Sequence, residues 1–134
     1  MCYCDTDKAF AHCCQPVLAN PSTANQPVTL MRARFSAHYL GDNPFLQRTA
    51  TTAMQSTTLN TTITWIKLEI INAPTPHRLR PHKGSVCFNA YYEDAQGITH
   101  VLHETSVFRF KKHQWYYTGA TDRTTDTPTA ADSA

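Results

Sequence analysis

The clearest helical pattern in this chain lies between residues 28 and 40, where apolar side chains recur at steps of three and four residues. Pro27 precedes this stretch, and its missing N–H costs nothing at the first position of a helix. Gly41 follows and is well placed to end the helix. The apolar residues of this pattern are Val28, Leu30, Met31, Phe35, Tyr39 and Leu40. We therefore expect a helix over 27–40, with a short second helix opening at 42–46.

Four later segments alternate between apolar and polar residues or are dense in β-branched and aromatic side chains, which is typical of β-strands. The expected strands lie near 62–71, 84–94, 98–110 and 114–118. Asp94-Ala95-Gln96-Gly97 is favourable turn chemistry, so the second and third strands should form a hairpin. Because the connections between the last three strands are too short for a crossover, we expect an antiparallel sheet. The Thr-rich segment 49–62 shows no pattern that predicts a helix or a strand.

The two ends of the chain differ from this central part. Residues 1–16 are rich in cysteine, and 17–26 carry the Pro, Ser and Asn residues of a linker. From residue 120 onward there is no large apolar side chain, so burial cannot offset the entropy of ordering the chain. We therefore expect a small knuckle at 1–16, a linker at 17–26, one domain at 27–119 and a disordered tail at 120–134.

The bulk composition narrows the functional classes. A length of 134 residues suits one compact domain. The net charge of +2 is too small to create the positive electrostatic potential that attracts nucleic acid. No apolar run approaches the roughly 20 residues of a membrane-spanning helix, and the N-terminus lacks the pattern of a signal peptide. We expect a cytoplasmic protein without membrane contact, for which nucleic acid is an unlikely partner.

Four cysteines near the N-terminus indicate a metal site, and they are Cys2, Cys4, Cys13 and Cys14. The first two can present thiolates from one tight turn, and the adjacent pair can complete the tetrahedral all-sulfur shell that zinc favours. A reducing compartment disfavours the alternative of a disulfide knot. His12 is a candidate substitute for one ligand. Cys87 stands alone in a strand and is expected to pack as a small apolar residue.

The strand near 98–110 carries a carboxylate on its expected core face. Alternation places Glu104 on the side of the apolar residues Leu102, Phe108 and Phe110. A buried carboxylate needs partners, and Ser106 together with Arg32 or Arg34 of the long helix can supply them. One interpretation is a structural ion pair, and the other is a pocket acid with a raised pKa. We prefer the ion pair, because no second acid, base or nucleophile is evident and His103 should face away.

Taken together, these residues resemble the YchJ-like family of bacterial proteins, whose N-terminal SEC-C motif is a zinc knuckle. The four cysteines match the family's Cys-x-Cys and Cys-Cys positions, and Phe10 matches its aromatic position. The match extends through most of the chain to Gly119. The body motifs are Leu-Met-Arg-Ala-Arg-Phe-Ser-Ala at 30–37, Trp-Ile-Lys-Leu-Glu-Ile at 65–70, Leu-His-Glu-x-Ser-x-Phe at 102–108 and Trp-Tyr-Tyr at 115–117.

The resemblance implies an α+β fold of the nuclear transport factor 2-like (cystatin-like) kind. In that fold, helices pack on a strongly curved antiparallel sheet and leave a cone that can hold a small ligand. The resemblance implies no established reaction. The chain departs from the family where Asp5-Thr6-Asp7 replaces Gly-Ser-Gly, where Trp-His is absent around 49–54, and where Val107 replaces Arg. Many relatives carry a second cysteine knuckle at the C-terminus, where residues 120–134 of this chain are polar and contain no cysteine. The loss of Trp-His and Arg weakens a catalytic hypothesis.

Three hypotheses follow for function. The preferred one is a zinc-binding module whose knuckle docks on a protein partner, with a small ligand in the cone as a further expectation. The second is an isomerase- or dehydratase-type enzyme that uses Glu104 in the cone. The third is contact with nucleic acid or the ribosome through Lys8, the 78–83 loop and Lys111-Lys112.

Overall fold

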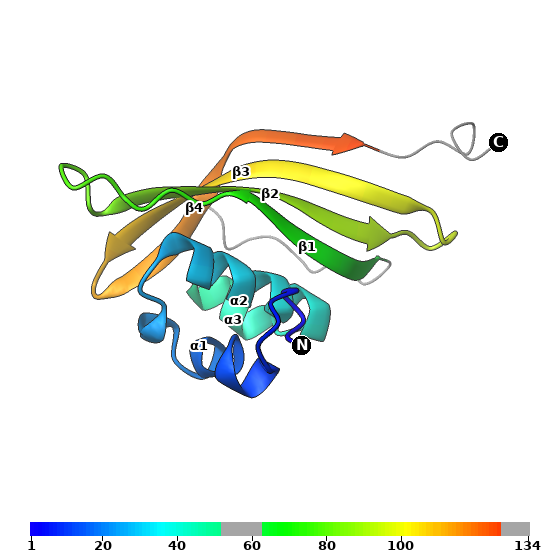
Figure 1. Ribbon diagram of the computed structural model, residues 1–134, viewed down its shortest axis with the longest axis horizontal. Helices are drawn as coiled ribbons and strands as arrows, with labels where there is room; N and C mark the ends of the chain where they lie inside the picture. The colour runs from blue at the N-terminus through cyan, green and yellow to red at the C-terminus, as the bar shows by residue number, and fades with distance from the viewer. Residues whose placement is uncertain (52–62, 127–134) are drawn as a thin grey trace.

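The protein consists of an antiparallel sheet with helices on one of its faces, as the computed structural model shows for residues 1–51 and 63–126 (Figure 1). The strand order is β1-β2-β3-β4. The strands are β1 Thr64–Asn72, β2 Lys83–Glu93, β3 Thr99–Lys111 and β4 Gln114–Asp126. The helices are α1 Gln15–Ala19, α2 Pro27–Leu40 and α3 Asn43–Arg48, with short 3-10 helices η1 Phe10–His12 and η2 Pro21–Thr23. The expected antiparallel topology is confirmed.

Helix α2 is the main element of the helical layer, and its bounds agree with the sequence pattern. Pro27 occupies its first turn, and Gly41 ends it in the left-handed conformation with a φ of 74°. The start of α2 lies so close to β2 that a Cβ atom on Gly84 would collide with the ring of Pro27. The helix buries Leu30, Met31, Ala33, Phe35, Ser36 and Ala37. The short helix α3 also follows the prediction, because the Asp42 side chain accepts a hydrogen bond from Phe45 N at 3.2 Å.

The turns and irregularities of the sheet give it its shape. At the β2–β3 turn, the Asp94 carboxylate accepts hydrogen bonds from the N–H groups of Gln96 and Ile98, at 2.9 and 3.0 Å. At the β3–β4 turn, Lys112 and His113 both have positive φ, as a tight two-residue hairpin requires. The registers of β1 with β2 and of β3 with β4 are each interrupted twice. Such irregularities bend strands and increase their twist, which curves the sheet over α2.

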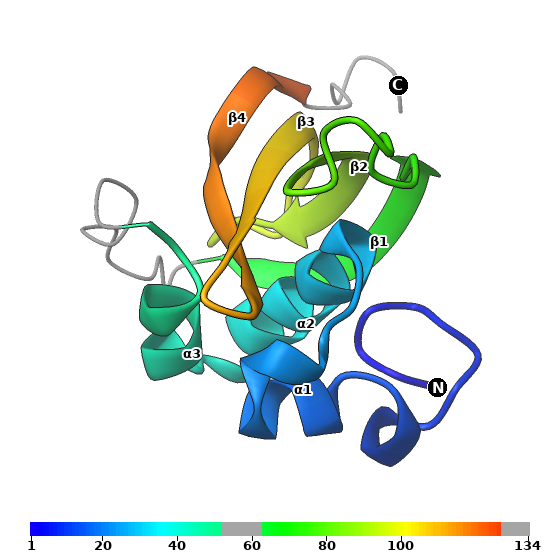
Figure 2. The same ribbon diagram turned by 90° about the vertical axis from the view of Figure 1, so that its left-hand side faces the viewer.

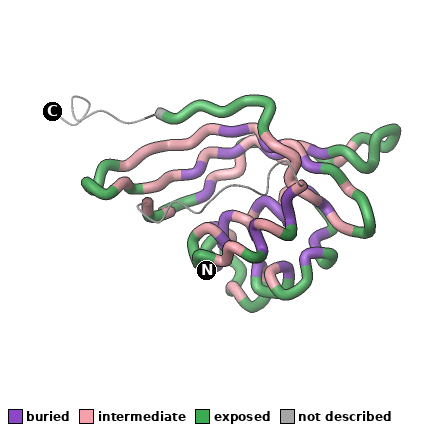
Figure 3. The backbone as a smooth tube through the Cα atoms, turned by 180° about the vertical axis from the view of Figure 1, so that it is seen from behind, coloured by how far each residue is buried: buried purple, intermediate pink, exposed green. Residues whose placement is uncertain are grey.

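The core lies between α2 and the inner face of the sheet. Along β2, Val86, Phe88 and Ala90 are buried, and along β3 Glu104, Ser106 and Phe108 are buried. This alternation fixes the inner face, and Figure 3 shows the buried segments where helix and strands face each other. Within the described ranges, no helix has the length and apolar character needed to cross a membrane.

Two segments differ from the sequence expectation. Residues 17–26, expected to be a linker, contain most of α1 and all of η2. The disorder expected from residue 120 is wrong for 120–126, because β4 continues to Asp126. Backbone hydrogen bonds to β3 hold this polar strand in place. Backbone pairing does not require apolar side chains, so the hydrophobic pattern of the sequence does not predict it. The rest of the expected tail, 127–134, and most of the Thr-rich segment, 52–62, lie outside the described residues.

Candidate metal centre and the inward polar network

The four N-terminal cysteines lie together, with all four Sγ atoms within 4.8 Å of one another. The Sγ atoms of Cys4 and Cys13 are 3.6 Å apart, and those of Cys13 and Cys14 are 4.0 Å apart. A tetrahedron with Zn–S bonds of about 2.3 Å has edges of about 3.8 Å, so these separations fit a zinc ion. All four cysteines are free of disulfides. His12 is exposed and is not part of the group.

Tight turns bring the two cysteine pairs together. Asp5 N donates to Cys2 O at 3.0 Å, and Asp5 has a φ of 69°, so the chain reverses directly after Cys4. Cys14 is the N-cap residue of α1, and Cys13 follows η1 directly. The spacing of the cysteines therefore fits one compact turn on each side of the site.

The thiols influence one another's ionisation. The hydrogen bond from Cys14 lowers the pKa of Cys4 to about 4 against the opposing effect of burial. The same hydrogen bond and burial raise the pKa of Cys14, and burial raises the pKa of Cys13. Thr6 adds its hydroxyl at 3.1 Å from Cys13 Sγ. The cluster therefore holds at least one thiolate readily, and the thiolate is the form of cysteine that binds metals.

The cysteine segment is fastened to the rest of the protein. Cys2, Cys4 and Cys14 belong to the same apolar cluster as residues of α2. Arg32 of α2 donates to the carbonyl oxygen of Cys4 at 2.8 Å, and the Asp5 carboxylate accepts from Leu68 N of β1 at 2.6 Å. The knuckle is therefore an integral part of the fold, and Arg32 supports the knuckle and makes no ion pair with Glu104.

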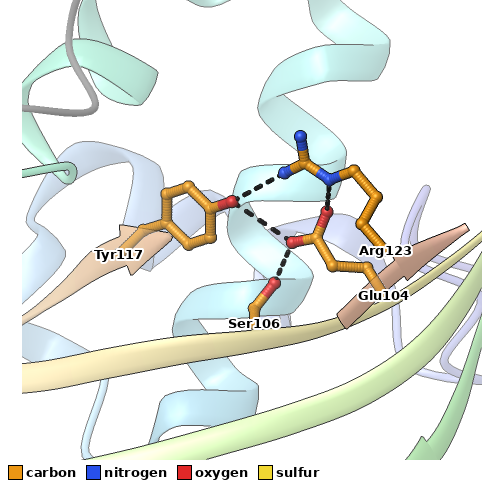
Figure 4. Close-up of polar contacts among 4 residues, drawn as sticks. All are labelled: Glu104, Ser106, Tyr117 and Arg123. Carbon is orange, nitrogen blue, oxygen red and sulfur yellow. Dashed lines mark hydrogen bonds and ion pairs between the residues drawn. The ribbon is translucent and has the colours of Figure 1, made fainter. Parts of the chain in front are cut away.

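Glu104 faces the inside of the sheet, as its alternation predicts, and it is 4 % exposed. Ser106 Oγ donates a short hydrogen bond to Glu104 Oε2, and Tyr117 OH donates to the same oxygen at 3.2 Å. Arg123 Nε forms an ion pair with Glu104 Oε1 at 2.7 Å, as Figure 4 shows. Burial and then Glu104 raise the pKa of Tyr117, which keeps its hydroxyl a donor.

The expected pairing of Glu104 with Arg32 or Arg34 is wrong, because the partner is Arg123 of β4. Arg34 instead donates to Leu46 O at 2.9 Å and to Thr49 Oγ1 at 2.7 Å. Its guanidinium lies 4.7 Å from the centre of the Tyr117 ring, so it approaches the network only through that ring. Burial lowers the pKa of Arg34 to about 10, with Tyr117 and Glu104 acting in the opposite direction.

His103 lies on the opposite face of β3 from Glu104, as expected. Its Nδ1 is 2.8 Å from Asn89 Oδ1, and its Nε2 is 3.7 Å from Cys87 Sγ. Cys87 is thus half-buried on the outer face, where its thiol lies beside polar side chains, whereas it was expected to pack as a small apolar residue. The sequence analysis did not predict these contacts, although strand alternation places Cys87, Asn89 and His103 on the same outer face of the paired strands β2 and β3.

Comparison with known proteins agrees with this architecture. The family model described as "YchJ, middle NTF2-like domain" matches residues 26–120. A UPF0225 protein of Vibrio cholerae serotype O1 is 35% identical over 122 residues, which cover 87% of this chain and 79% of that protein. A UPF0225 protein of Deinococcus radiodurans is 29% identical over 123 residues, which cover 90% of this chain and 88% of that protein.

A solved structure has the same fold. The solution structure of a SEC-C motif containing protein from Rhodopseudomonas palustris matches with a TM-score of 0.77 at 23% identity, over 89% of this chain and 95% of that one. The predicted NTF2-like cone with a small N-terminal cysteine knuckle is confirmed. The chain therefore belongs to the YchJ-like family of bacterial proteins, with a SEC-C type cysteine motif ahead of its NTF2-like domain.

Proposed function

We propose that this chain is a zinc-containing binding protein in which Cys2, Cys4, Cys13 and Cys14 hold one structural zinc ion. The observation that carries the proposal is the close grouping of the four sulfur atoms, all within 4.8 Å of one another. Four thiolates complete the shell of a structural zinc site and leave no open position for substrate. The metal's role would be to fasten the N-terminal segment to α2 and β1.

Metal analysis of the purified protein tests the zinc site, and the chain offers a matched control. Wild type and Cys87→Ser should each contain one zinc per chain, because Cys87 lies outside the cluster. Cys14→Ser should lose most of its zinc, since a hydroxyl is a poor replacement for a thiolate. Wild type without metal, or Cys14→Ser with full zinc content, would refute the assignment.

The binding function itself would be docking of a protein partner on the knuckle. Tyr3 of the knuckle stacks on Tyr39 of α2 with ring centroids 4.6 Å apart, and Phe10 meets Tyr3 edge-on. Tyr3 and Tyr39 are 38% and 47% exposed, and Leu40 beside them is 46% exposed. Exposed aromatic groups of this kind are typical of protein interaction sites. Zinc would act indirectly, by holding Tyr3 against α2.

Site-specific photo-crosslinking in cells tests this docking. A photoreactive phenylalanine at Tyr39 should give a discrete crosslinked product that disappears in the Cys14→Ser background. The same group at Ile98 is the control, because Ile98 is also 47% exposed but lies at the β2–β3 turn. Equal crosslinking at the two positions, or none at Tyr39, would contradict docking at the knuckle.

The arrangement of Glu104 supports a structural role in this proposal. Its two oxygens accept hydrogen bonds from Ser106, Tyr117 and Arg123. A general acid or base would have to give up such contacts to reach a substrate. Glu104 is therefore assigned to holding β3 and β4 together.

A further inference from the structure

The loop that joins β1 to β2 projects beyond one end of the sheet (Figures 1 and 2). Between this loop and the sheet lies a cavity of about 530 Å³ that is largely open to solvent. Sites for small ligands have volumes of roughly 300–1,000 Å³. The sheet residues that line it include Ser85, Thr105 and Val107, which alternate with the buried residues of the inner face. The cavity is therefore separate from the cone interior and shares no residue with the cysteine cluster.

The lining of this cavity is basic and rich in hydroxyl groups. Its basic residues are His77, Arg80 and Lys83, its hydroxyl residues include Ser85, Thr105 and Thr121, and it contains no Asp or Glu. Within residues 1–51 and 63–126, neither Arg80 nor Lys83 takes part in an ion pair. These side chains thus have charge available for a ligand.

Strand register adds an electrostatic argument for an anion at this place. Lys83 of β2 lies directly opposite Arg109 of β3. Like charges in opposed positions of an antiparallel pair repel each other and destabilise the sheet. A bound anion beside Lys83 would offset this repulsion. The register also places one carboxylate near the cavity floor, that of Asp122 opposite Thr105.

The basic loop is also organised to receive a ligand. Leu79 N donates to His77 Nδ1 at 3.1 Å, so a neutral His77 carries its proton on Nε2, where it can donate to an anion. Arg80 N donates to His77 O at 2.8 Å, and Phe110 N donates to His82 O at 2.8 Å. Prolines at 74, 76 and 81 restrict the backbone further. A loop held in place in this way loses little entropy when a ligand binds.

We propose that this cavity binds the phosphate group of a small phosphorylated molecule, such as a sugar phosphate or a mononucleotide. Arg80, Lys83 and His77 Nε2 would contact the phosphate, since guanidinium and ammonium groups make their strongest hydrogen bonds to such oxygens. The hydroxyls on the sheet would contact the remaining oxygens, and the rings of Pro74 and Pro76 would contact the body of the ligand. This inference goes beyond the proposed function, because it concerns a different site and a different ligand.

Titration of the ¹⁵N-labelled, zinc-loaded protein with AMP, ribose 5-phosphate and adenosine tests this site by NMR. The two phosphates should shift the amide signals of Gly84, Ser85 and Val107 saturably, and adenosine should not. Arg80→Gln should weaken AMP binding by about tenfold or more, since it removes a charged hydrogen bond. Arg78→Gln is the matched control from the same loop, because Arg78 does not line the cavity, and it should change binding less than about twofold.

A gain of affinity provides a test that misfolding cannot imitate. Asp122→Asn removes the carboxylate opposite Thr105 and should tighten AMP binding by about two- to fivefold. The proposal is overturned if adenosine binds as well as AMP, or if Arg80→Gln and Arg78→Gln have equal effects. It is also overturned if a ten-nucleotide RNA binds more tightly than AMP and depends on Lys111 and Lys112. None of these results bears on zinc content, so this inference and the proposed function fail separately.

Discussion

The carboxylate of Asp5 accepts a hydrogen bond from the backbone N–H of Leu68 at 2.6 Å and so joins the cysteine segment to the edge strand β1. Asp5 itself has a φ of 69°, a left-handed conformation that Asp and Asn tolerate better than Ala does. One residue thus both reverses the chain after Cys4 and anchors the knuckle. The family's usual glycine at this place would permit the turn but could not supply the anchor.

The first prediction separates these two roles of Asp5. Asp5→Ala loses the charged hydrogen bond and strains the turn, so it should lower the free energy of unfolding by about 2–4 kcal/mol. Asp5→Asn keeps an acceptor and tolerates the conformation, so its cost should stay near 1 kcal/mol. Urea unfolding of the zinc-loaded proteins measures both values. An Asp5→Ala variant as stable as wild type would show that the contact does not fasten the knuckle.

The second prediction concerns the ion pair between Glu104 and Arg123. Their side chains are 5% and 56% exposed, so a freed Arg123 can turn toward water. Glu104→Gln should therefore cost only about 1–2 kcal/mol of unfolding free energy, less than the loss expected when a fully buried partner is left unpaired.

A double-mutant cycle with Arg123→Gln isolates this pair. The coupling energy between the two changes should be about 0.5–1 kcal/mol. The same cycle with Arg34→Gln should show a smaller coupling, because Arg34 donates to Leu46 and Thr49. A larger coupling with Arg34 than with Arg123 would contradict the observed pairing.

The third prediction uses the half-buried His38. Its ring packs against Trp65 with centroids 5.7 Å apart, and burial followed by Arg34 lowers its pKa from 6.5 to about 4. The unfolded chain takes up a proton on His38 below about pH 6.5, whereas the folded protein does so only below about pH 4. The free energy of unfolding should therefore fall as the pH drops through this window.

Comparison with His38→Gln isolates this effect, because acid would also weaken the proposed metal binding by the four cysteines, and would do so equally in both proteins. Between pH 7 and pH 5, wild type should lose roughly 2 kcal/mol more unfolding free energy than His38→Gln, or somewhat less because the ring retains some contact with water. Equal losses in the two proteins would show that His38 does not titrate in this window.

Sequence reasoning succeeded where chemistry is local. The spacing of Cys2, Cys4, Cys13 and Cys14 predicted that the four cysteines gather in space, and the pattern of 27–41 gave the two ends of α2. Alternation also gave the inward direction of Glu104, because its neighbours on that face are apolar. In each case the information lies within about fifteen residues of the chain.

The partners of Glu104 could not be found in the same way. Arg123 lies on the part of β4 that has no apolar pattern, and only pairing with β3 brings it opposite Glu104. The two arginines expected to pair with Glu104 have other partners. Arg32 donates to the carbonyl oxygen of Cys4, and Arg34 donates to the hydroxyl of Thr49. Helical periodicity gives the direction of a side chain relative to a core but not the element that it meets.

The central claim is that one zinc ion, bound by four cysteine sulfurs, holds the N-terminal segment on the NTF2-like domain. X-ray absorption at the zinc edge of the purified full chain tests it most directly. We predict a first shell of four sulfur atoms at about 2.3 Å. A protein that contains no zinc, or a first shell with nitrogen or oxygen in place of one or more sulfurs, would contradict it.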